Sequence, residues 1–147
     1  MKDRVIKKWF AIISNHKISL RDRMFRIATS ICMIALLLIM PMGRNLGNIL
    51  LMILSLLAMG IIVEVSIKKS RIQTGATAIS VLLLLLFPIS YFTAGGFYSG
   101  VPEWFIFCYV YVCITLRGRR LWVFLLLCMA ETLLCYGISF YFPELVA

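Results

Sequence analysis

Glu131 is the side chain in this sequence with the clearest potential for chemistry, because it lies in the middle of the apolar run 121–142. If that run crosses a membrane as a helix, a carboxylate at its centre costs on the order of 3 kcal/mol to insert. No other acid or histidine lies at comparable depth. Two interpretations stay open: a protonated side chain hydrogen-bonded inside a helical bundle, or a proton relay. Helical spacing places four residues on its face: Phe124, Cys128, Cys135 and Ile138.

The thiols and the single imidazole predict neither a metal site nor a disulfide framework. All five cysteines fall inside apolar runs and none belongs to a CxxC pair, so we interpret each as a small hydrophobic residue. They are Cys32, Cys108, Cys113, Cys128 and Cys135. His16 has no partner at ligand spacing. We therefore expect no metal ion and no cofactor.

Sequence signatures of catalysis are missing as well. The chain has no glycine-rich phosphate loop, no HExxH and no GxSxG motif. One histidine and six carboxylates, spread along the chain, do not supply the parts for hydrolysis or phosphoryl transfer. We expect that this chain alone is not an enzyme.

The composition is typical of an integral membrane protein. Hydrophobic residues make up 63% of the 147 residues and charged residues only 14%, and the mean hydropathy is +1.01. Soluble domains carry about a quarter charged residues. A helix needs about 20 residues to cross the hydrocarbon core. The sequence predicts an all-α, polytopic bundle of five transmembrane helices at residues 24–43, 46–67, 75–93, 101–116 and 121–142, the fourth being the shortest.

Charge along the chain predicts its orientation. The formal net charge is +9, which in a soluble domain would indicate nucleic acid, but here the basic residues flank the apolar runs. We expect anionic lipid headgroups as their partner and no nucleic acid. The opposite side of the five-span arrangement holds only Arg44, so the positive-inside rule puts the N-terminus in the cytoplasm and residues 143–147 outside. The basic side holds Lys2, Arg4, Lys7, Lys8, Lys17, Arg21, Arg23, Arg26, Lys68, Lys69, Arg71, Arg117, Arg119 and Arg120.

Three local features add detail to this predicted arrangement of five spans. Residues 1–23 form a basic cytoplasmic segment that is either an interfacial amphipathic helix or a plain topology-setting flank. Glu64 precedes Lys68 by four residues, which favours a structural ion pair. Pro88 is expected to kink the third span near its outer end.

The segment Thr93 to Pro102 has three glycines, a proline and two aromatic residues, which predicts a structured turn instead of a helix. Ser99 or Gly100 is suited to cap the fourth helix, and Pro102 fits its first turn. Glu103 there complements the positive end of the helix dipole. Trp104 then lies where an outer aromatic belt is expected.

The last 60 residues carry motifs that resemble a known family. They read FPISYFTAGGFYSGVPEWFIF at 87–107, RGRRLWVFLLL at 117–127 and YFPELV at 141–146. This order resembles the membrane-embedded N-terminal sensor region of bacterial sensor histidine kinases and related diguanylate cyclases. The resemblance implies a sensory role for Gly95, Gly96, Ser99, Gly100, Pro102, Trp104 and Phe105, with Pro143, Glu144 and Leu145 as a second outer element.

The resemblance also implies parts that this sequence does not contain: a sixth span, a cytoplasmic coiled coil and an output domain. We therefore expect a truncated sensor module, or one separated from its output domain, of a two-component type signalling protein, homodimeric and located in the bacterial plasma membrane. Two other classes stay open. One is a small oligomeric transporter or channel subunit, which needs polar residues at matching depths on several spans. The other is a membrane anchor or assembly protein without a ligand.

Overall fold

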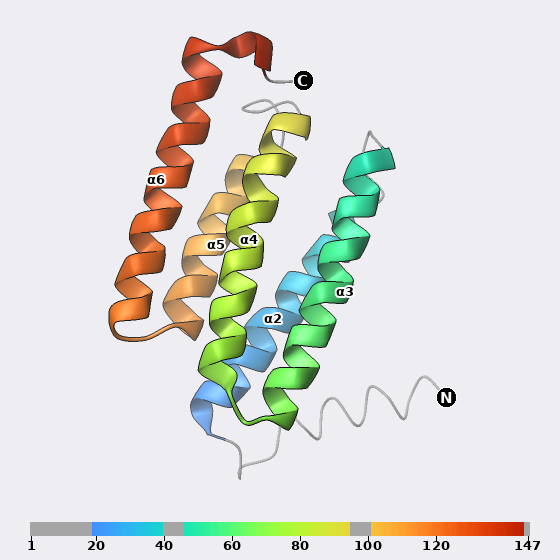
Figure 1. Cartoon of the computed structure of the whole chain (residues 1–147), viewed down its shortest axis with the longest axis vertical. Coiled ribbons are helices and arrows are strands. Elements are labelled where there is room, and N and C mark those ends of the chain that lie inside the picture. The colour runs from blue at the N-terminus through green and yellow to red at the C-terminus, as the bar shows by residue number, and fades with distance from the viewer. Residues whose placement is uncertain (1–18, 40–45, 95–100, 146–147) are drawn as a thin grey trace.

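The fold is a bundle of five α-helices followed by one short 3-10 helix, seen in a computed structural model that describes residues 19–39, 46–94 and 101–145. No strand occurs among these residues. Successive helices run up and down, and α4 lies between α3 and α6 with α2 and α5 behind it (Figure 1). The elements are α2 Leu20–Ile39, α3 Leu46–Lys68, α4 Ile72–Ala94, α5 Val101–Thr115, α6 Arg119–Tyr141 and the 3-10 helix Pro143–Leu145.

The first helix begins earlier than the sequence predicted. The expected start was Met24, whereas α2 begins at Leu20, because Ser19 caps it. The Asp22 backbone N–H donates to Ser19 Oγ at 3.3 Å and to the Ser19 carbonyl at 2.9 Å. The proposed amphipathic segment 1–23 lies almost wholly outside the described residues, which begin at Ser19.

Three of the five helices are long and apolar enough to cross a membrane: α3, α4 and α6. They indicate a membrane protein, and length and composition support the prediction of a membrane span for these three helices but not for all five. Helix α2 is not among these three helices, because its first two turns carry Arg21, Asp22, Arg23 and Arg26. Helix α5 has 15 residues and so extends about 22 Å, less than a hydrocarbon core of about 30 Å.

Helix α4 forms the centre of the bundle. In its span 44% of residues are buried, against 17% in each of α3 and α6. Ala76, Ile79, Leu83 and Tyr91 on α4 have no exposed surface. The outward faces of α3 and α6 carry large aliphatic residues such as Leu50, Leu54, Leu126 and Leu133, as expected for helices whose surroundings are lipid.

Hydrogen bonds between side chains connect neighbouring helices. The hydroxyls of Thr29 on α2 and Tyr111 on α5 lie 3.1 Å apart, and both residues are buried. At the other edge of the bundle the Thr93 hydroxyl donates to Asn48 Oδ1 at 2.8 Å, which joins α4 to α3. Such bonds replace the water that a hydrocarbon environment cannot supply.

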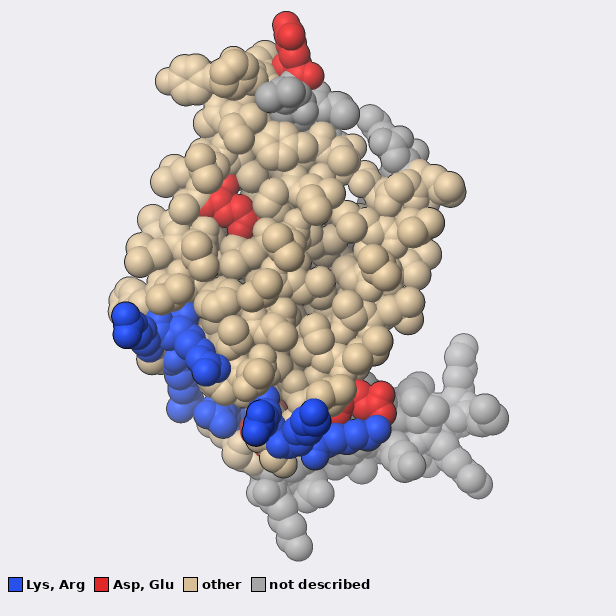
Figure 2. Space-filling view, viewed as in Figure 1, with Lys and Arg blue, Asp and Glu red and all other residues tan. Residues whose placement is uncertain are grey.

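Lysine and arginine gather at one end of the molecule, which we call the basic end (Figure 2). This end holds the start of α2, the α3–α4 turn and the α5–α6 turn (Figure 1). The predicted ion pair is confirmed there, with Lys68 Nζ 2.6 Å from Glu64 Oε1. In the part of the chain that the structure describes, the opposite end has no lysine or arginine and carries Glu103 and Glu144.

The expected turn from Thr93 to Pro102 is shorter than predicted at both ends. Helix α4 continues six residues past Pro88 to Ala94, and α5 begins at Val101. The Thr93 hydroxyl shares its single proton between Asn48 Oδ1 and the Ile89 carbonyl, which is 2.7 Å away and supports the last turn of α4. Only residues 95–100 lie between the two helices, and these are outside the described residues.

Candidate functional site

An aromatic cluster joins three helices at the end of the bundle opposite the basic end. Phe105 of α5 is buried, and its ring centroid lies 6.1 Å from that of Phe87 and 5.9 Å from that of Tyr91, both on α4. It also lies 6.1 Å from the ring of Tyr136 on α6. Aromatic pairs at these separations attract beyond simple area burial. Phe105 therefore holds α4, α5 and α6 together.

Trp104 is the half-buried neighbour of this cluster. Its ring lies 6.4 Å from Phe87 on α4 and 5.7 Å from Phe107 on its own helix. Its position in the first turn of α5 places it next to the segment 95–100 along the chain. Glu103 is exposed in the same first turn, where its charge complements the helix dipole as predicted.

Tyr91 extends the cluster toward α6. It is fully buried, and its hydroxyl accepts a hydrogen bond from the Ser139 hydroxyl at 2.9 Å. Its ring lies 6.1 Å from that of Tyr136. The hydrogen bond restricts the orientation of the Tyr91 side chain, and the ring contact restricts the distance between α4 and α6. Together they hold the ends of these two helices in register.

The sensory candidates from the sequence are placed only in part. Gly95, Gly96, Ser99 and Gly100 lie outside the described residues. Pro102 lies in the first turn of α5, as predicted. Glu144 is exposed in the 3-10 helix Pro143–Leu145 that follows α6. The structure thus brings Trp104 and Phe105 into one cluster and leaves Glu144 on the surface.

Glu131 lies at the centre of α6, as the sequence predicted, and Phe124, Cys128 and Cys135 on its face are buried. The side chain is half-buried. The internal hydrogen bond that the first of the two interpretations requires is not found for Oε1, which is buried without a partner among residues 19–39, 46–94 and 101–145. Burying a carboxyl oxygen without a hydrogen-bond donor costs free energy of folding. The stability of the bundle therefore does not explain why a glutamate stands at this position.

A pair of thiols next to Glu131 was missed by sequence reasoning. Cys108 Sγ on α5 and Cys128 Sγ on α6 lie 3.7 Å apart, and both residues are buried. The signal was present in the sequence, since the two cysteines are equally far from Gly118 at the turn between their helices. Residues equidistant from the turn of an antiparallel helix pair lie at the same depth.

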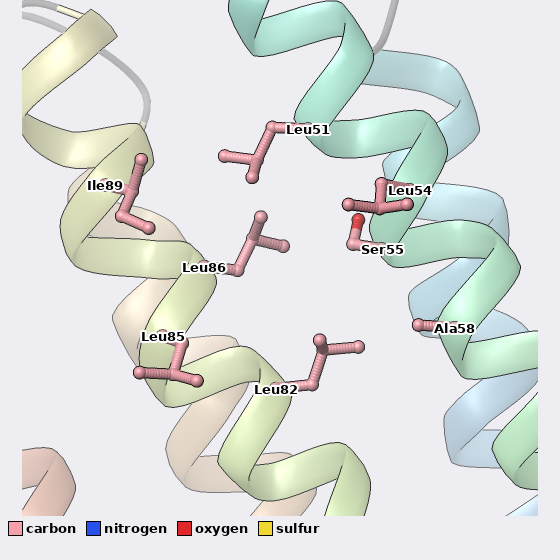
Figure 3. Close-up of a pocket in the computed structure, with 8 residues that line it drawn as sticks. All are labelled: Leu51, Leu54, Ser55, Ala58, Leu82, Leu85, Leu86 and Ile89. Atoms are coloured by element: carbon pink, nitrogen blue, oxygen red, sulfur yellow. The ribbon is translucent and has the colours of Figure 1, made fainter.

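A second candidate is an apolar pocket of about 170 Å³ between α3 and α4. Figure 3 shows Leu51, Leu82 and Leu86 directed into the gap between the two helices. The only polar side chain in its wall is Ser55, whose hydroxyl donates to the Met52 carbonyl at 2.8 Å. Such a wall offers no recognition of a charged or polar ligand. The lining residues are Leu51, Leu54, Ser55, Ala58, Leu82, Leu85, Leu86 and Ile89.

In the described part of the chain, no three histidine, cysteine or acidic side chains are grouped so that they could hold a metal ion. His16 lies outside that part. No protein-family model, curated protein or solved structure matches this chain.

Proposed function

We propose that this chain is the membrane-embedded input module of a bacterial signalling protein of the histidine kinase or diguanylate cyclase type. In this proposal it is a homodimer in the plasma membrane that contacts anionic headgroups at its basic end. The segment between α4 and α5 and the 3-10 helix Pro143–Leu145 face outward and respond to a stimulus. The resemblance of residues 87–146 to such sensor regions supports this assignment.

One observation carries the proposal: the candidate sensory residues Trp104 and Phe105 are in ring contact with the helices that would carry a signal. A stimulus at the segment between α4 and α5 would act first on the start of α5. Because Phe105 contacts both α4 and α6, a movement of α5 would shift all three helices together. Helix shifts of about 1–2 Å are a common form of signal transmission.

We also propose that all five helices cross the bilayer, with the basic end in the cytoplasm. The up-and-down arrangement supports this, since α2, α4 and α6 start at the basic end and α3 and α5 finish there (Figure 1). The arginines at the start of α2 have stems long enough to reach the headgroups. A bilayer that thins locally accommodates the short α5 at a modest cost.

The test compares two tryptophans in the signalling protein that carries this module. Trp104→Ala removes the ring contact with Phe87, whereas Trp122→Ala removes a ring that is 68% exposed on α6 near the basic end. We expect signalling output to change for Trp104→Ala and to stay at the wild-type level for Trp122→Ala. Unchanged output from Trp104→Ala, at normal amounts of membrane protein, would contradict the sensory role.

A transport or channel subunit is the second candidate, favoured by the buried Glu131 oxygen that has no partner within the described part of the chain. Intramembrane acids often belong to ion or proton pathways. Under this hypothesis an oligomer reconstituted in lipid vesicles would conduct protons or ions, and Glu131→Gln would abolish the flux. No flux above that of empty vesicles would exclude the hypothesis.

A further inference from the structure

The α5–α6 interface contains two thiols in direct contact at mid-depth of the bundle. Cys108 is the central residue of α5, and Cys128 lies near the centre of α6. Their sulfurs are 3.7 Å apart and each residue is 2% exposed. A disulfide needs a sulfur separation of about 2.0 Å, so the two sulfur atoms must move closer together before a bond can form.

Glu131 lies one helical turn from this pair. It follows Cys128 by three residues on α6 and therefore lies on the same face, one turn along the helix. Its Oε1 atom is buried and has no hydrogen-bond partner in the described ranges. Oε1 accepts no hydrogen bond from either thiol, so the carboxyl must turn toward Cys128 before it can accept the thiol proton.

We propose that Cys108 and Cys128 form a peroxide-oxidised dithiol, which closes into a disulfide that links α5 to α6, with Glu131 as the proton acceptor. The inference is independent of the sensory role proposed above. The oxidant is hydrogen peroxide, because sulfurs that are almost fully covered and flanked by apolar side chains admit only a small, uncharged molecule.

The chemistry balances with peroxide as the sole co-reactant. Glu131 accepts the Cys128 proton, and the resulting thiolate attacks one oxygen of the peroxide. An S–O bond forms and the O–O bond breaks. The released hydroxide then takes the proton from Glu131 and becomes water. The Cys108 sulfur then attacks the Cys128 sulfenic acid. An S–S bond forms, the S–O bond breaks, and the hydroxyl leaves with the Cys108 proton as a second water. Two thiols are oxidised, and one peroxide is reduced to two waters.

The chain provides a direct assay for this link. Trypsin cuts at Arg117, Arg119 and Arg120 in the α5–α6 turn, and no other lysine or arginine occurs in 72–116 or 121–147. One fragment then carries Cys108 and Cys113, and the other carries Cys128 and Cys135. A disulfide between the helices keeps the fragments together on a non-reducing gel.

The experiment uses the full chain reconstituted in lipid vesicles, treated with hydrogen peroxide, blocked with an alkylating reagent and then digested in detergent. We expect linked fragments that separate on reduction. The link should persist in Cys113→Ala and Cys135→Ala and vanish in Cys108→Ala and Cys128→Ala. An unlinked wild type, or a link that survives Cys108→Ala, would overturn the assignment.

The role of Glu131 is tested by the rate of oxidation. Loss of a general base slows a reaction by about 100-fold, and we expect Glu131→Gln to slow linking on that scale. Glu64→Gln, which alters an exposed acid near the basic end of α3, should leave the rate unchanged. Thermal unfolding of each variant in detergent confirms that it is folded. Oxidation of folded Glu131→Gln at the wild-type rate would remove the carboxyl from the proposal.

Discussion

Ser66 on α3 lies so close to Gly75 on α4 that a methyl group on the glycine would overlap the serine side chain. A Cβ atom built on Gly75 would stand 2.6 Å from Ser66 Cβ, which no change of side-chain rotamer can relieve. The Arg71 backbone N–H also donates to the Ser66 carbonyl at 3.1 Å. The missing side chain at position 75 therefore sets how closely α3 and α4 approach at the basic end.

Gly75→Ala is expected to destabilise the bundle. Overpacking costs about 1–3 kcal/mol, which exceeds the gain of up to about 1 kcal/mol from replacing a helical glycine by alanine. The control is Gly60→Ala, since the nearest atom to a Cβ there is Met33 Cε at 4.0 Å, an ordinary contact. Thermal unfolding in detergent measures both variants. Equal midpoints would show that α3 and α4 separate at little cost.

The hydrogen bond between Thr29 and Tyr111 predicts a measurable coupling of α2 to α5. Bonds of this kind in membranes contribute about 0.6 kcal/mol, with a maximum near 1.7 kcal/mol. Tyr111→Phe and Thr29→Val each remove one hydroxyl, and the double variant completes a cycle. We expect a coupling energy within that range from reversible unfolding in mixed detergent. A value near zero would mean that each hydroxyl finds an equally good partner in its own helix.

Phe105 is expected to be the most sensitive residue of the aromatic cluster. Phenylalanine-to-alanine changes in a core cost about 3–5 kcal/mol, because a large cavity remains. Its neighbour Ile106 provides the matched control, because it lies on the same helix and is 66% exposed. We predict a large loss of thermal stability for Phe105→Ala and a small change for Ile106→Ala. Similar losses of thermal stability for Phe105→Ala and Ile106→Ala would show that the aromatic cluster does not belong to the core.

The helices were largely predictable because lipid imposes a simple rule on the sequence. The predicted starts at 46 and 101 coincide with those of α3 and α5, and the other bounds differ by a few residues. One of the largest differences has a local cause, since the Ser19 cap moves the start of α2 from the expected Met24 back to Leu20. Apolar runs define where helices lie, whereas single hydrogen bonds define where they begin and end.

The site was less predictable, because it depends on contacts between helices. The apolar run of α5 gives no sign that Phe105 faces two helices while Ile106 faces outward. Nor does it show that Cys108 meets Cys128 whereas Cys113 stays exposed. A helical run that is apolar on all sides has no periodic signal to mark its buried face. Position relative to the α5–α6 turn was the only guide to the thiol pair.

The proposed orientation of the bundle predicts where reporter proteins are active. In the described ranges every lysine and arginine lies at the basic end, which the positive-inside rule would place in the cytoplasm. A periplasmic phosphatase fused after Ala147 should be active, whereas the same enzyme fused after Lys69, in the α3–α4 turn, should be inactive. A cytoplasmic fluorescent reporter at the same two positions should give the opposite result. Phosphatase activity at both positions would show that Lys69 and Ala147 lie on the same side of the membrane. Only two of the helices α4, α5 and α6 would then cross, and the short α5 would be the one that does not.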